Sequence, residues 1–187
     1  MMADLYLALL HYPVYDKTGK VVTTAVTNLD VHDIARLART VGARGFYVCT
    51  PVDTLRRLVA RIIRHWEVGP GATYNATRRE ALALVRQAPE LDDAIADIER
   101  ETGHLPRVVA TTARPGENRL THRALRARLA ADGPPELLVL GTGWGLTADV
   151  LARVDDVLEP IEGTGAYNHL SVRAAAAIML DRLRSER

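Results

Sequence analysis

Short apolar runs alternate along this chain with longer segments in which apolar residues recur every three or four positions. The short runs predict strands at 5–10, 45–50, 107–112, 137–141 and 156–160. The periodic segments predict helices at about 31–41, 55–66, 91–101, 120–131 and 171–183. Alternating strands and helices are typical of an α/β fold, in which an open, mostly parallel sheet carries helices on both faces.

The helix predicted at 171–183 is apolar on most of its surface. Its expected buried stripe includes Ala176 and Met179, while Ala174, Ala177 and Ile178 lie on other faces. A helix that is apolar all round is buried on several sides. We therefore expect a partner subunit to cover it, and a twofold homodimer is the commonest arrangement for a soluble oligomer.

Composition narrows the class of protein. The 187 residues fit a single domain covering 1–187, and 48% hydrophobic with 25% charged residues is ordinary for a globular chain. A net charge of +1 excludes a strongly cationic nucleic-acid-binding protein, although not a local basic patch. The only cysteine, Cys49, lies in an apolar run and is expected to be buried. The apolar run 5–10 is too short for a signal peptide or membrane span, so we expect a cytoplasmic protein.

Three glycines alternate with other residues after the strand predicted at 137–141. The run Gly141-Thr142-Gly143-Trp144-Gly145 leads to Leu146 and a further helix. Glycine lets backbone N–H groups approach a ligand closely. The spacing matches neither the phosphate-binding loop that ends in Gly-Lys-Ser/Thr nor the dinucleotide-binding fingerprint. A ligand-binding loop and a tight strand-to-helix turn are both consistent with it.

A second polar segment follows the strand predicted at 156–160. Ile161 and Gly163 open a loop that reaches Asn168-His169-Leu170-Ser171 at the head of the alanine-rich last helix. Asn168 or Ser171 can cap that helix, and capping alone would explain either residue.

In this order, these two segments resemble the second and third signature motifs of the SPOUT superfamily, the SpoU–TrmD-like RNA methyltransferases. In that superfamily the second motif is an apolar strand with a glycine loop ending in Gly-Leu, here Gly141 to Leu146. The third is a Pro-Ile turn, a loop, and an Asn and Ser-Val before an alanine-rich helix, here Pro160 to Val172. Asn28, the segment 33–36 and Gly42 match the first motif more faintly. More narrowly, the chain is similar to a small bacterial group of S-adenosylmethionine (SAM)-dependent RNA methyltransferases without an appended RNA-binding domain.

The resemblance implies an α/β sheet with a C-terminal trefoil knot, a homodimer, and SAM as cofactor, with no metal. It assigns the cofactor pocket to three strand ends and the last loop. The implied cofactor-binding residues are Thr111, Thr112, Gly141, Thr142, Gly143, Leu146, Ile161, Gly163, Asn168, His169, Leu170 and Ser171. The middle motif usually carries Glu where this chain has Gly143, so we do not assume methylation of the ribose 2′-hydroxyl.

The catalytic candidates lie in the first predicted helix. Arg36 matches the first-motif arginine of the family and would orient a phosphate or steady developing charge. His32, whose ordinary pKa of about 6.5 suits a general base, precedes Arg36 by one helical turn, and Asp33 could serve instead. Arg173, in an apolar helix, implies a buried partner or an active-site charge. Basic residues off the apolar stripe of the second predicted helix are candidates for contact with RNA, namely Arg56, Arg57, Arg61, Arg64 and His65. Further candidates are Arg78, Arg79, Arg114 and Arg119.

Two other functions are open. The glycine run also looks like the first motif of Rossmann-type methyltransferases, but too few residues follow Gly145 for the strands such a fold still needs. The missing Glu at Gly143 would also suit a non-catalytic RNA-binding or regulatory homodimer. Cofactor binding together with methyl transfer to cellular RNA (rRNA or tRNA) separates an enzyme from that alternative.

Overall fold

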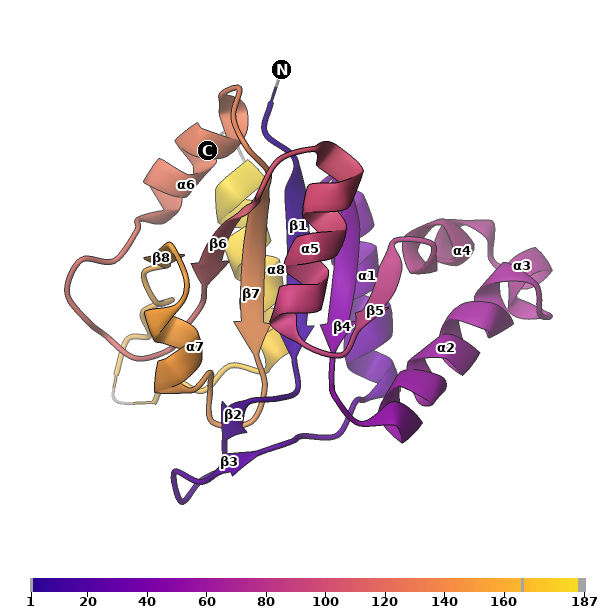
Figure 1. Cartoon of the computed structure of the whole chain (residues 1–187), viewed down its shortest axis with the longest axis horizontal. Coiled ribbons are helices and arrows are strands. Elements are labelled where there is room, and N and C mark those ends of the chain that lie inside the picture. Colours follow the sequence, from indigo (N-terminus) through magenta and orange to yellow (C-terminus); the bar gives the residue numbers. More distant parts are fainter. Residues whose placement is uncertain (1, 166, 185–187) are drawn as a thin grey trace.

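A computed structural model describes residues 2–165 and 167–184 of the protein. Its main feature is a six-stranded sheet in the order β5-β4-β1-β7-β6-β8, in which every pair of neighbours is parallel (Figure 1). The strands are β1 (Leu5–Leu10), β4 (Gly45–Cys49), β5 (Val85–Ala88), β6 (Arg107–Ala110), β7 (Glu136–Gly141) and β8 (Asp156–Val157). A separate antiparallel pair is formed by β2 (Val14–Tyr15) and β3 (Val21–Val22).

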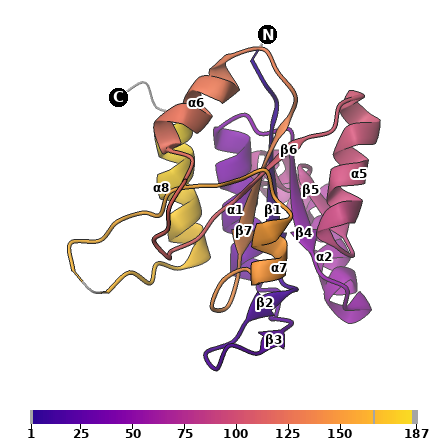
Figure 2. The same ribbon diagram turned by 60° about the vertical axis from the view of Figure 1, so that its left-hand side comes forward.

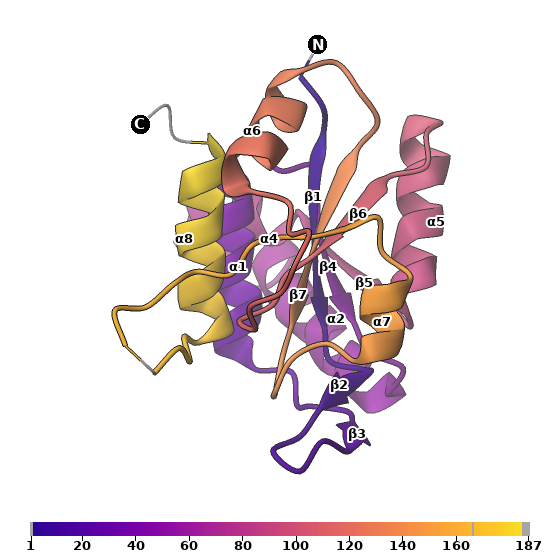
Figure 3. The ribbon, with the colours of Figure 1, turned by 90° about the vertical axis from the view of Figure 1, so that its left-hand side faces the viewer.

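Helices cover both faces of the sheet and bury its apolar strands. The helices are α1 (Asn28–Thr40), α2 (Asp53–Glu67), α3 (Gly71–Tyr74), α4 (Ala76–Leu82), α5 (Leu91–Thr102), α6 (His122–Ala130), α7 (Ala148–Ala152) and α8 (Val172–Arg184). Side chains of α1, α2, α4, α6 and α8 share one core with the sheet, and those of α5 and α7 share the other. Figures 2 and 3 show α8 and α1 on one side of the strands and α5 on the other. The result is the three-layer α/β arrangement that the sequence pattern predicts.

The central strand, β1, is apolar along its whole length. All six residues of β1 are buried, because β1 lies between β4 and β7 and both of its faces are covered by helices. A parallel strand covered in this way needs a continuous apolar run rather than an alternating one. Cys49, at the end of β4, is buried as predicted, and burial raises the pKa of its thiol to about 12.

Several elements differ from the sequence prediction. The strand predicted at 156–160 is only β8, because it pairs with β6 at just two positions. The helix predicted at 120–131 begins at His122, after the capping hydroxyl of Thr121. The helix expected after the glycine run is the short α7. The pattern did not predict β2, β3, β5, α3 or α4, which are each seven residues or shorter.

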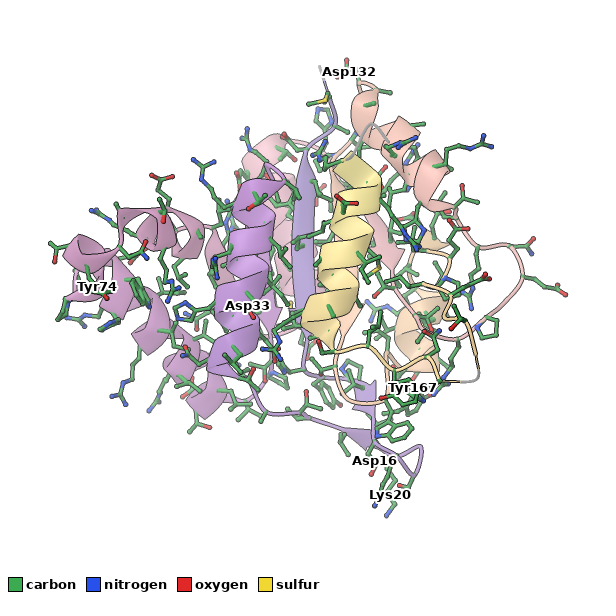
Figure 4. All side chains as sticks on the ribbon, turned by 180° about the vertical axis from the view of Figure 1, so that it is seen from behind. Asp16, Lys20, Asp33, Tyr74, Asp132 and Tyr167 are labelled. Carbon is green, nitrogen blue, oxygen red and sulfur yellow. The ribbon has the colours of Figure 1, made fainter. Side chains whose placement is uncertain are left out.

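Helix α8 packs against α1, α6 and β7, which cover much of its apolar surface. Ala176, Met179, Leu180 and Leu183 are buried, whereas Ala174, Ala177 and Ile178 are partly exposed. Figure 4 shows α1 and α8 side by side on the face turned away from the viewer in Figure 1. In the described part of the chain, no helix is long and apolar enough to cross a membrane.

Candidate cofactor cavity

A cavity of about 880 Å³ lies at the carboxyl edge of the sheet. Its walls are residues 24–25 and 30 after β1, 111–115 after β6, 140–146 and 151 around the end of β7, 161 after β8, and 168–172, 175 and 179 at α8. Ligands of open α/β sheets bind outside the carboxyl ends of the strands, and this volume suits a small organic ligand.

The glycine loop is held against the β2–β3 hairpin by its backbone. Tyr15 N donates to Gly145 O at 2.9 Å, and Trp144 N donates to Tyr15 O at 2.9 Å. Gly143 has φ +60°, and a Cβ there would lie 2.8 Å from Tyr15 O. Any side chain at this position would collide with backbone. The hairpin therefore accounts for the glycine that stands where related motifs carry Glu.

The other two glycines serve the cavity in different ways. Gly145 has φ +102°, and a Cβ there would meet nothing within 4 Å, so its missing side chain leaves open space along the cavity wall. A Cβ on Gly141 would lie 2.9 Å from Leu146 Cγ. Gly141 thus allows Leu146 to fold back under the loop, where it is almost fully buried.

A chain of polar side chains runs beneath the cavity from Thr142 to His11. The Thr142 hydroxyl donates to Leu10 O at 2.9 Å and lies within hydrogen-bond distance of the Thr24 hydroxyl, which is 3.1 Å from His11 Nδ1. The Thr24 hydroxyl has two acceptors within reach, Thr142 Oγ1 and His11 O at 3.4 Å, and it accepts from His11 Nδ1 when that nitrogen carries the proton. The other ring nitrogen, Nε2, is buried without a hydrogen-bond partner in the described residues. Burial lowers the pKa of His11 to about 4, which keeps the ring neutral.

The last loop is fixed at both of its predicted polar positions. Ser171 Oγ accepts from Ala174 N at 3.3 Å, so the capping role predicted for Ser171 is confirmed. Asn168 Nδ2 instead donates to Ala113 O at 3.3 Å and ties the last loop to the segment after β6. The chain segments 111–121 and 158–165 cross here, as Figure 3 shows.

Most of the predicted cofactor-binding residues line this one cavity, although they come from distant parts of the sequence. Those that do are Thr111, Thr112, Gly141, Thr142, Gly143, Leu146, Ile161, Asn168, His169, Leu170 and Ser171. Gly163 is not among the residues that line it, and a Cβ there would lie 3.0 Å from Tyr167 O. Thr111 is anchored by its hydroxyl, which donates to Val139 O at 3.0 Å.

The catalytic candidates in α1 lie outside the cavity of their own chain. The His32 ring packs edge-on against Trp66, and its pKa is lowered by burial and by the nearby Arg78. Asp33 pairs with Arg173 at 3.5 Å, and Arg36 is exposed. The position of Arg36 on the surface would let it act only on something bound outside this subunit's cavity.

Sequence reasoning missed Asp30, the one carboxylate among the described residues that line the cavity. Its side chain is only 14% exposed; one oxygen lies 3.2 Å from Arg173 Nε and the other accepts from the Thr27 hydroxyl at 2.6 Å. Arg173 therefore has the buried partner that an arginine in an apolar helix implies. Thr24 and Ala25 were also missed, because no motif shows that the segment before α1 crosses the end of β7.

Known proteins include a family and several relatives that match nearly the whole chain. The model of a family described as SAM-dependent RNA methyltransferase matches residues 4–185. A tRNA (guanine-N(1)-)-methyltransferase of Oleidesulfovibrio alaskensis is 47% identical over 180 residues, which are 96% of this chain but 42% of that protein. An uncharacterized protein of Aquifex aeolicus is 44% identical and is matched over 88% of its length.

Among solved structures, the SpoU methyltransferase AviRb of Streptomyces viridochromogenes matches all of this chain and 61% of its own, with a TM-score of 0.61 and 18% identity. At that identity the likeness concerns the fold, and it confirms the SPOUT-like α/β architecture. Since the chain spans less than half of the tRNA methyltransferase from Oleidesulfovibrio, the activity of that whole protein is not established by the match.

Proposed function

The chain belongs to the SAM-dependent RNA methyltransferase family, and on that premise we propose that it binds SAM in the cavity and transfers the methyl group to RNA. The observation that carries the proposal is the convergence of the glycine loop, the segment after β6 and the last loop on one cavity at the carboxyl edge of the sheet. The proposed RNA is a tRNA or an rRNA.

The residues present fit such a cofactor. The open space beside Gly145 gives a flat group access to the backbone, and Leu146, Ile161 and Leu170 supply apolar surface on the cavity wall. Backbone groups of these loops would hold the adenine edge, and the threonine chain from Thr142 to His11 would keep the glycine loop in place. When bound, SAM supplies an electrophilic methyl group, so the protein has to position the acceptor in line with it.

Asp30 is the proposed proton acceptor in this reaction. An acceptor O–H or N–H loses its proton when the methyl group is transferred, and a nearby base assists that loss. Asp30 is placed at the cavity wall, while Arg173 and Thr27 fix its carboxylate by an ion pair and a hydrogen bond. His32 and Asp33 remain alternative bases, to be reached only from a second subunit.

A homodimer is part of the proposal, with the face formed by α1 and α8 as the interface (Figure 4). Ala174, Ala177 and Ile178 on α8 are partly exposed apolar side chains, and Asp33 of α1 lies on the same face. In this arrangement Arg36 of one subunit would reach RNA bound at the partner's cavity and hold a phosphate with its paired N–H donors.

The crossing of segments 111–121 and 158–165 supports the proposal of a C-terminal trefoil knot. Leu158 N donates to Ala110 O, Glu159 N donates to Leu120 O, and Asn168 Nδ2 donates to Ala113 O, so the later segment is hydrogen-bonded to the earlier one at three points. We further take residues 1–187 as one methyltransferase domain that acts in the cytoplasm. An experimental structure traced through both segments tests the knot.

Methyl transfer to cellular RNA tests the function. RNA from a deletion strain, incubated with the purified protein and tritium-labelled SAM, should gain label that RNA from the parent strain does not. Mapping the labelled nucleotide would also separate base from ribose acceptors. Cofactor binding without transfer to any RNA would instead favour the non-catalytic RNA-binding homodimer.

A further inference from the structure

Three aromatic rings gather at the mouth of the cavity from two separate loops. The His169 ring lies between Trp144 and Tyr167, with ring centroids 5.9 Å and 5.3 Å away, and meets both at steep angles of 61° and 78°. Trp144 belongs to the glycine loop, whereas Tyr167 and His169 belong to the loop before α8. We call Trp144, Tyr167 and His169 the aromatic rim.

The aromatic rim is exposed although it is large and partly held in place. Trp144 is 55% exposed and Tyr167 is 78% exposed. Trp144 N donates a hydrogen bond to Tyr15 O of β2. Asn168, which lies between Tyr167 and His169 in the chain, donates a hydrogen bond to Ala113 O after β6. Large aromatic surfaces left in solvent beside a cavity are typical of binding sites, and rigid rings lose little conformational entropy when a ligand stacks on them.

Arg114 lies beside the rim and has no carboxylate partner among the described residues. Arg114 Nη2 is 3.5 Å from Trp144 O, and its guanidinium lies 5.9 Å from the Tyr15 ring centroid, so both contacts leave its charge available. The chain has only two lysines, Lys17 and Lys20, and both are exposed in the turn of the β2–β3 hairpin. Figure 4 places Tyr167 and Lys20 at the same end of the molecule.

We infer that the aromatic rim binds an unpaired RNA base by stacking, and that Arg114 and the hairpin lysines hold the adjoining phosphates. This inference rests on the proposed function, since the base would be the acceptor nucleotide or its direct neighbour. Exposed aromatic rings interleaved with cations are the means by which proteins hold single-stranded RNA without reading a duplex. A protein partner would explain the rings but not Arg114 at the rim together with two exposed lysines in the β2–β3 turn.

Quenching of Trp144 fluorescence by a ten-nucleotide oligoadenylate tests the inference directly. Trp66 is the other tryptophan, so a Trp66→Phe background leaves Trp144 as the single reporter. With S-adenosylhomocysteine present, oligoadenylate should quench Trp144, whereas inorganic polyphosphate, which has charge but no bases, should not. Trp144→Leu should weaken oligoadenylate binding by about 5- to 150-fold, the range for loss of one stacked base, and Trp144→Phe should retain most of the affinity.

Control measurements separate this inference from its alternatives. Tyr74→Leu removes a still more exposed ring, 87% exposed on α3, and should leave oligoadenylate binding unchanged. Because Trp144 also lines the cavity, oligoadenylate binding by the native protein and by Trp144→Leu is compared both without S-adenosylhomocysteine and at saturating S-adenosylhomocysteine, and the loss should be the same in both. Equal quenching by polyphosphate, a loss of oligoadenylate affinity only when S-adenosylhomocysteine is present, or a loss of self-association in Trp144→Leu by sedimentation would each overturn the inference. Failure of the native protein to bind S-adenosylhomocysteine would refute the proposed function. The quenching of Trp144 by oligoadenylate would still test the inference about RNA stacking independently.

Discussion

His11 should make the fold sensitive to mild acid. The ring is fully buried, its Nδ1 lies 3.1 Å from the Thr24 hydroxyl, and Nε2 has no hydrogen-bond partner in the described residues. Protonation would bury a charged ring, and the nearby Asp30 and the backbone of Ala25 offset only part of that cost. Burial lowers the pKa of His11 to about 4 in the folded chain, whereas an unfolded chain titrates near 6.5.

The sign and size of the effect follow from these two pKa values. Between them the unfolded chain binds more protons than the folded chain, so the stability present above pH 6.5 is lost as the pH falls. For one group, linkage gives a loss of about 1 kcal/mol between pH 7 and pH 5.5, and about 3 kcal/mol by pH 4. His32 adds a smaller loss of the same sign, because burial and Arg78 lower its pKa as well.

Urea unfolding at pH 7 and pH 5.5 measures this loss, and that range lies above the ordinary titration of carboxylates. His11→Gln keeps a donor for Thr24 but cannot be protonated. The loss of unfolding free energy between pH 7 and pH 5.5 should therefore be about 1 kcal/mol smaller in His11→Gln than in the native protein. The matched control His104→Gln removes an exposed histidine and should keep the native pH dependence. Parallel losses in the native protein and His11→Gln would refute the assignment of a buried neutral ring.

Three further substitutions address other parts of the account. Arg36→Ala should leave SAM affinity unchanged by calorimetry and cut methyl transfer strongly, with little rescue by Arg36→Lys; weaker SAM binding with normal turnover would contradict its assignment to RNA. Asp30→Asn should lower the turnover number by about 10²- to 10⁴-fold, with the Michaelis constant for SAM nearly unchanged, and a normal turnover number would exclude it as the base. Arg128→Met should lower the free energy of unfolding in urea by about 3 kcal/mol. Glu136, whose side chain is 3% exposed, would lose the arginine that lies 2.7 Å from its carboxylate. A loss below about 1 kcal/mol would mean that Glu136 is readily neutralised.

The parts of the fold that the sequence predicted are those in which burial alone decides the structure. β1, β4 and β7 are continuous apolar runs because both faces of the sheet are covered. By contrast, β5 has Arg86 and Gln87 in its middle and gives no such signal. Arg86 belongs there because its guanidinium packs over the rings of Tyr6 and Tyr47 and pairs with Glu101, and these partners come from other elements.

The same division applies to the site. Glycine spacing and the polar loop before α8 identified most of the cavity, since those residues are set by local backbone requirements and by the family motifs. Thr24, in the segment before α1, and Asp30, in the first turn of α1, reach the cavity only because this part of the chain packs against the glycine loop, a tertiary contact without a periodic signature. The first-helix candidates were chosen by motif, and only a second subunit could bring them to a cavity.

Calorimetric titration with S-adenosylhomocysteine tests the central claim most directly. The native protein should bind one molecule per chain, and Ala175→Leu, which adds a branched side chain at the cavity wall, should abolish binding. Ala174→Leu makes the same change one residue earlier, away from the residues that line the cavity, and should bind like the native protein. Absence of binding heat in the native protein at several temperatures, or equal binding by Ala175→Leu, would contradict the assignment of this cavity to the cofactor.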